Sequence, residues 1–141
     1  MELSRETRIV AGVILLTVPS IMYGGITLLG VLTAGTAGLA PAGLQLNDTQ
    51  WALFRAGHAH AGVWVLFAIV LQVLLDSASL SAGLKWLARI SAPVAAVALP
   101  GGFFGLAFVP AFRWLMYLGA ASFGIAVLVT GVGLLRRRER A

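Results

Sequence analysis

The chain has 141 residues, of which 60% are hydrophobic and only 11% are charged, with a formal net charge of +5. Its mean hydropathy is +0.95, and a water-soluble domain of this size could not hide so much apolar surface in its core. The composition therefore excludes an ordinary soluble domain and indicates an integral membrane protein. The chain has no cysteine, which also excludes disulfides, thiolate metal sites and CxxC redox chemistry.

Four apolar segments are long enough to cross a bilayer, since about 30 Å of hydrocarbon takes roughly 20 helical residues. In chain order they cover about residues 9–32, 51–75, 86–108 and 114–135. We therefore expect an all-α integral membrane protein, a four-transmembrane-helix bundle in which residues 1–141 form a single transmembrane domain. The longest connection ends in Asn47, Asp48, Thr49 and Gln50, polar side chains that favour the N-terminus of the second helix.

The first and third segments contain residues that interrupt helices, namely Pro19 in the first and Pro100, Gly101 and Gly102 in the third. Proline removes one backbone hydrogen bond and clashes with the preceding turn, so we expect helix breaks at these positions. Tyr23 lies at a similar depth, about 12 to 15 Å from the outer end of its helix. Broken helices at mid-membrane often line a binding site, although proline kinks are also routine in membrane helices and are satisfied locally.

The second segment carries most of the ionisable residues inside the predicted spans, in the sequence FRAGHAHAG. At about 100° per residue, Arg55, His58, Gln72 and Asp76 share one polar stripe, which should face the bundle interior or a neighbouring subunit. Asp76 lies near the inner surface, where it needs no special role. His60 lies about 200° from His58, so one metal could bind both imidazoles only if the helix unwinds.

The basic residues are distributed unequally between the two sides of the predicted bundle. One side has Arg5, Arg8, Lys85, Arg89, Arg136, Arg137, Arg138 and Arg140, and the other has Arg55 and Arg113. This bias predicts that the N and C termini are cytoplasmic, and it makes the lipid bilayer, not nucleic acid, the expected partner of the positive charge. The preference for Arg over Lys is typical of a high-GC bacterial genome, so we expect a multi-pass protein of the bacterial inner (plasma) membrane.

These residues favour a small oligomeric membrane protein with a buried histidine site for a cofactor, a metal or a small ligand. The candidate binding residues are His58, His60, Arg55 and Tyr23, and the two histidines are also the candidate metal ligands. Haem or a divalent metal is the candidate cofactor, which would imply redox chemistry. Bis-histidine haem needs ligands on facing helices, so it requires a two-fold dimer that supplies His58 from each chain, whereas a single axial histidine needs no dimer.

Two further function classes stay open. An oligomeric proton or small-ion channel or transporter would use the polar stripe as its path, because four helices are too few to enclose a pore alone. A structural accessory subunit of a membrane complex would present the histidines to a partner helix, and Arg55 would then only reach the lipid headgroups along its stem. An enzyme is the least supported class, because no nucleophile with a base, no buried carboxylate pair and no phosphate loop is recognisable.

Overall fold

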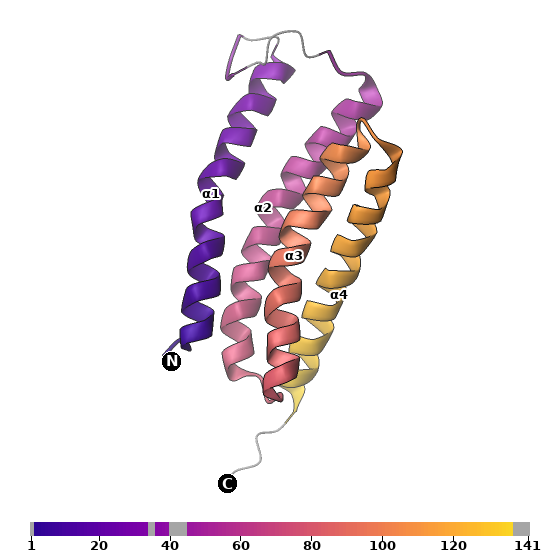
Figure 1. The fold of residues 1–141 in the computed structure, drawn as a ribbon. Coiled ribbons are helices and arrows are strands. Elements are labelled where there is room, and N and C mark those ends of the chain that lie inside the picture. The colour runs from indigo at the N-terminus through magenta and orange to yellow at the C-terminus, as the bar shows by residue number, and fades with distance from the viewer. Residues whose placement is uncertain (1, 34–35, 40–44, 137–141) are drawn as a thin grey trace.

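The computed structural model describes residues 2–33, 36–39 and 45–136, and no strand occurs among them. Its elements are α1 (Arg5–Leu32), α2 (Asp48–Ser77), α3 (Ala82–Leu106), the short 3-10 helix η1 (Pro110–Phe112) and α4 (Arg113–Leu135). The four helices lie side by side and alternate in direction (Figure 1). We call the end at which α1 begins and α4 ends the terminal end, and the opposite end, near η1, the loop end.

Each of the four helices is long and apolar enough to cross a membrane, which confirms the all-α class and the four expected helices. All four helices begin earlier than predicted, and polar residues cap the first three of them: Ser4 for α1, Asn47 for α2 and Ser81 for α3. The side chain of Ser4 accepts a hydrogen bond from Thr7 N at 3.1 Å. Asn47 and Gln50 form a reciprocal capping box at the start of α2, as their sequence predicts.

The predicted helix breaks are not present. α1 is continuous through Pro19, and α3 is continuous through Pro93 and Pro100. A proline removes only one hydrogen bond of the helix, so the bonds of the flanking turns can carry the helix through it. Gly101 and Gly102 also lie within α3, and the second of them serves the contact with α4.

α3 and α4 form the most extensive helix contact of the bundle, and two glycines make it possible. A Cβ atom added at Gly102 would lie 2.6 Å from the backbone nitrogen of Met116, and one added at Gly119 would lie 2.6 Å from that of Leu99. Such distances are too short for any side chain, so each glycine lets the backbone of the facing helix approach closely. These two helices therefore form the most closely packed pair of the bundle.

α1 is the least buried helix. It packs chiefly against α2, and 11% of its most apolar window is buried, compared with 56% in α3. The buried apolar core at mid-bundle consists of Ile14 of α1, Val65, Ala68 and Leu71 of α2, Ala92 and Ala96 of α3, and Ala126 of α4. Beyond this core, α1 contacts its neighbours again at both ends of the bundle, and the candidate functional residues lie at those contacts.

Candidate functional site

His58 lies at the interface of α1 and α2, in the half of the bundle nearer the loop end. Its ring rests on Gly25 of α1, where an added Cβ atom would lie 3.0 Å from both Cε1 and Nε2 of the imidazole. The missing side chain at Gly25 is therefore what makes room for the ring. Within the described residues, the half-buried imidazole of His58 has no hydrogen-bond partner.

A cavity of about 290 Å³, which we call the inner cavity, opens beside this imidazole between α1, α2 and α3. Its lining is mainly apolar and is formed by Tyr23, Gly24, Thr27, Leu28, Val31, Leu46, Trp51, Phe54, His58 and Phe104. Tyr23 is 63% exposed, so only part of its ring contributes. The structure thus brings together two of the four residues proposed from the sequence, His58 and Tyr23.

A second hollow, which we call the outer groove, lies between α1 and α2 alone and has a volume of about 470 Å³. It is lined by Val18, Ile21, Met22, Gly25, Ile26, Leu29, His58, Gly62, Val65 and Leu66. His58 is the residue that both linings share. Its imidazole is therefore flanked by open space on two sides.

His60 points to a different part of the bundle. Its Nδ1 donates a hydrogen bond to the carbonyl oxygen of Ala56 at 2.7 Å, and its ring lies 4.8 Å from that of Phe103 on α3 and 6.1 Å from that of Trp64. α2 is helical throughout this stretch, so the unwinding that would let both histidines bind one metal does not occur. The structure thus corrects the metal assignment to His58 and His60, because their rings face different helices.

Arg55 is exposed and lines neither the inner cavity nor the outer groove. It borders a surface hollow at the loop end together with Asp48 and Trp51. The described residues contain no group of three or more His, Cys, Asp or Glu side chains that could hold a metal ion. Among the described residues a divalent metal therefore lacks a ligand set, and haem ligation by His58, from one chain or from two, stays a prediction.

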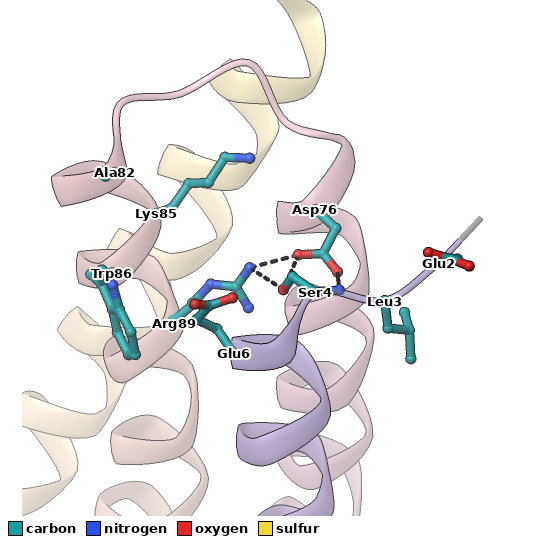
Figure 2. Close-up of a pocket in the computed structure, with 9 residues that line it drawn as sticks. All are labelled: Glu2, Leu3, Ser4, Glu6, Asp76, Ala82, Lys85, Trp86 and Arg89. Atoms are coloured by element: carbon teal, nitrogen blue, oxygen red, sulfur yellow. Dashed lines mark hydrogen bonds and ion pairs between the residues drawn. The ribbon is translucent and has the colours of Figure 1, made fainter.

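The terminal end holds a buried polar network that the sequence analysis did not predict. Arg89 of α3 is only 4% exposed and forms an ion pair with Asp76 of α2, with 2.6 Å between Nη2 and Oδ1. Figure 2 shows the Arg89 side chain reaching Asp76 and Ser4 in one cluster. Ser4 also donates to Asp76 from its backbone nitrogen at 2.9 Å and from its hydroxyl at 2.8 Å.

The fully buried side chains of Thr7 and Gln72 complete this network. Nη1 of Arg89 donates to Thr7 Oγ1 at 2.6 Å and to Gln72 Oε1 at 3.3 Å, and Gln72 Nε2 donates back to the carbonyl oxygen of Arg89 at 3.0 Å. Thr7 Oγ1 lies 3.0 Å from the carbonyl oxygen of Gln72 and 2.9 Å from Asp76 Oδ1, and can donate to either. The network therefore joins α1, α2 and α3.

The structure corrects the roles expected of Asp76 and Arg89. Asp76 was expected to have no special role, and Arg89 was counted among the basic residues at the membrane surface. A signal was present in the sequence, because Arg89 shares a helical face with Ala92 and Ala96, which are buried. A charged residue on a helix face of small residues indicates that its side chain points into the bundle. A buried cation then needs a nearby carboxylate as its partner.

No family model matches the chain, and no curated protein or solved structure matches it. The fold and the site by themselves define an apolar four-helix bundle. Each side chain of its polar network at the terminal end has a hydrogen-bond partner. Its mainly apolar inner cavity is bordered by the imidazole of His58, which has no such partner in the part of the chain that the structure describes.

Proposed function

We propose that this chain is a membrane protein that binds a small, mainly apolar molecule in the inner cavity, with His58 forming a hydrogen bond to its polar group. The observation that carries the proposal is a half-buried imidazole without a partner among the described residues, at the wall of an apolar cavity. Small-molecule sites have this composition, mostly apolar with a few polar groups. A ligand with one hydroxyl or carbonyl group could use the free hydrogen-bonding capacity of this imidazole while its apolar part fills the cavity.

The membrane part of the proposal rests on the four apolar helices and on the positive charge at the terminal end. Arg89 is paired with Asp76, but Arg5, Arg8 and Lys85 still favour a cytoplasmic terminal end. Arg137, Arg138 and Arg140, which add to this bias, lie outside the described residues. We propose a multi-pass protein of the bacterial inner membrane with both termini in the cytoplasm.

The orientation can be measured directly because the chain has no cysteine. Single cysteines at Glu2, Ser79 and Ala111 should divide into two classes. We expect a membrane-impermeant maleimide to label the Ala111→Cys variant from outside the cell, and the Glu2→Cys and Ser79→Cys variants only after lysis. Labelling of all three from outside, or the reverse pattern, would contradict the proposed topology.

A ligand site is better supported than a path for ions. Between His58 and Gln72 the same stripe of α2 carries Val65 and Ile69, which pack in the apolar core, so the polar residues are not continuous. Homo-oligomerisation and membership of a larger complex stay predictions. They can be checked from the mass of the protein purified in lipid nanodiscs.

The binding proposal can be tested by NMR, since the chain has two histidines. Isotope labelling of histidine alone gives two sets of ring signals, which the His58→Gln and His60→Gln variants would assign. Titration with 4-ethylphenol, a compact apolar probe with one hydroxyl group, should shift the ring signals of His58 in a saturable way and leave those of His60 in place.

Two glycine variants provide the matched comparison. An added Cβ atom at Gly24 or at Gly12 would meet nothing within 4 Å, so both tolerate a larger side chain. Gly24 lines the inner cavity, and the Gly24→Leu variant should lose the response, whereas the Gly12→Leu variant should keep it. If the His58 signals of the unmodified protein do not move at probe saturation, the proposal fails and an accessory structural role becomes the better account.

A further inference from the structure

The inner cavity and the outer groove differ in the kind of apolar side chain that lines them. Four of the ten residues that line the inner cavity are aromatic, namely Tyr23, Trp51, Phe54 and Phe104, whereas aromatic residues make up 9% of the chain. None of the ten residues that line the outer groove is Phe, Trp or Tyr. Both hollows border the imidazole of His58, so the contrast distinguishes two immediate neighbours.

The aromatic residues reach the inner cavity from three helices. Tyr23 belongs to α1, Trp51 and Phe54 belong to α2, and Phe104 belongs to α3. A molecule in the cavity therefore has an aromatic side chain on each of its three helical walls.

Two of these rings are held in place by contacts of their own. The ring centroids of Phe54 and Phe104 lie 5.3 Å apart with 67° between the planes, the edge-to-face arrangement that aromatic rings prefer. Phe54 makes a second contact of this kind with Phe108, at 5.8 Å. The Phe104 ring also lies over Gly57, where an added Cβ atom would be 2.9 Å from Cε1. These contacts fix the aromatic wall in advance, which lowers the cost of ordering it when a ligand binds.

The size of the cavity and its free polar group limit the ligand further. A cavity of about 150 Å³ already takes up benzene, so the 290 Å³ of the inner cavity has room for one substituted ring or two fused rings. The hydroxyl of Thr27 donates to the carbonyl oxygen of Tyr23 at 3.1 Å, whereas the imidazole of His58 has no hydrogen-bond partner among the described residues. A single hydrogen-bonding group at the edge of the ligand therefore suits this lining.

From these features we infer that the ligand of the inner cavity is a compact aromatic compound with a hydrogen-bonding group at one edge of its ring, of the phenol or indole class. The rings of Phe54 and Phe104 contact the ring of the ligand, and His58 bonds its polar group. This inference rests on the proposed function, because it names the ligand class of the same site. A saturated compound of the same size fills the cavity without ring–ring contacts and binds more weakly.

The test compares 4-ethylphenol with trans-4-ethylcyclohexanol, which has nearly the same size and the same position of the hydroxyl group but no aromatic ring. Each probe is titrated into the protein in lipid nanodiscs, and its partition into protein-free nanodiscs is subtracted. The ring signals of His58 then give the dissociation constants. We expect 4-ethylphenol to bind about tenfold more tightly, as two edge-to-face contacts would provide.

A phenol also donates a stronger hydrogen bond than an alcohol, and two ring-deleting variants separate that effect. Phe54→Leu and Phe104→Leu each remove a ring but leave His58 in place, so each should reduce the preference for 4-ethylphenol about threefold or more. Affinity for the alcohol should change far less. The control is Phe67→Leu, which removes a ring that contacts Phe123 and does not line the cavity, and it should keep the full preference. Circular dichroism checks that each variant is folded.

The two proposals fail differently. If 4-ethylphenol shifts the His58 signals but the alcohol binds as tightly, or if both Phe54→Leu and Phe104→Leu keep the full preference, the aromatic inference is wrong and the inner-cavity site stands. If neither probe shifts the His58 signals, both proposals are wrong.

Discussion

The two halves of the α1–α2 interface treat polar side chains in opposite ways. At the terminal end, Ser4 and Thr7 meet Asp76 and Arg89 in a network in which hydroxyls, carboxylate and guanidinium all have partners. Toward the loop end, the imidazole of His58 rests on the bare backbone of Gly25, borders two mainly apolar hollows and has no hydrogen-bond partner among the described residues.

This difference separates the polar residues that hold the bundle together from the imidazole that is left free to bind a ligand. A paired buried network fixes the relative position of three helices, because breaking any one bond leaves a desolvated group unsatisfied. A lone imidazole beside open space contributes little to the fold, and its hydrogen-bonding capacity remains available to a ligand. We therefore expect substitutions at the terminal end to change stability, and substitutions near His58 to change binding.

The largest effect should come from the Asp76→Ala substitution, which leaves the buried guanidinium of Arg89 without its carboxylate. Removing one partner of a buried ion pair costs several kcal/mol, and we expect a loss of about 3 kcal/mol in the free energy of unfolding. Titration with sodium dodecyl sulfate in mixed micelles, followed by circular dichroism, measures it. The control is Glu2→Ala, which removes an exposed carboxylate at the same end.

The double variant Asp76→Ala with Arg89→Met sharpens this test. It leaves no unpaired charge in the bundle, so it should be more stable than the Asp76→Ala single variant. Equal stability of the Asp76→Ala and Glu2→Ala variants would instead mean that the ion pair is effectively solvated.

A smaller loss is expected for Thr7→Val, an almost isosteric change that removes the hydroxyl contacting Arg89, Gln72 and Asp76. Since the hydroxyl is fully buried, we expect about 1–2 kcal/mol in the same titration. Thr17→Val is the matched control, because Thr17 is exposed and donates only to the carbonyl oxygen of Ile14 in its own helix. A comparable loss in both variants would show that the network does not depend on Thr7.

The smallest effect on stability should come from Gly25→Ala, whose new methyl group would lie 3.0 Å from the His58 ring. Overpacking usually costs about 1–3 kcal/mol, but this ring borders open space and can move, so the cost should be lower. The ring signals of His58 in the NMR spectrum should shift, while those of His60 stay in place. Gly24→Ala, which meets nothing within 4 Å, should leave both sets unchanged, and a shift of both would point to a general rearrangement.

The sequence was sufficient for the helices but only partly for the site. The apolar segments and the polar caps at Asn47 and Gln50 predicted four helices, because these signals are local in the chain. The stripe that includes His58 and Gln72 was also visible from helical periodicity. The predicted breaks at Pro19 and Pro100 were wrong, since a single lost hydrogen bond does not stop a helix whose other bonds are intact.

The partners of the polar residues were not visible in the sequence, because each lies on a different helix. Arg89 is separated from Thr7 by 82 positions and from Asp76 by 13, and spacing within one helix carries no information about such pairs. The role of Gly25 was hidden for the same reason, since a glycine in α1 reveals its purpose only when His58 of α2 lies against it.

By itself, then, the sequence determined the number, length and apolar character of the helices, because hydrophobicity and capping act over a few residues at a time. Only the tertiary structure decided that Asp76 and Arg89 are paired, that His58 and His60 face different helices, and that two hollows meet at His58. Those outcomes depend on how the helices are rotated and how closely they approach, and side-chain packing between distant segments sets both.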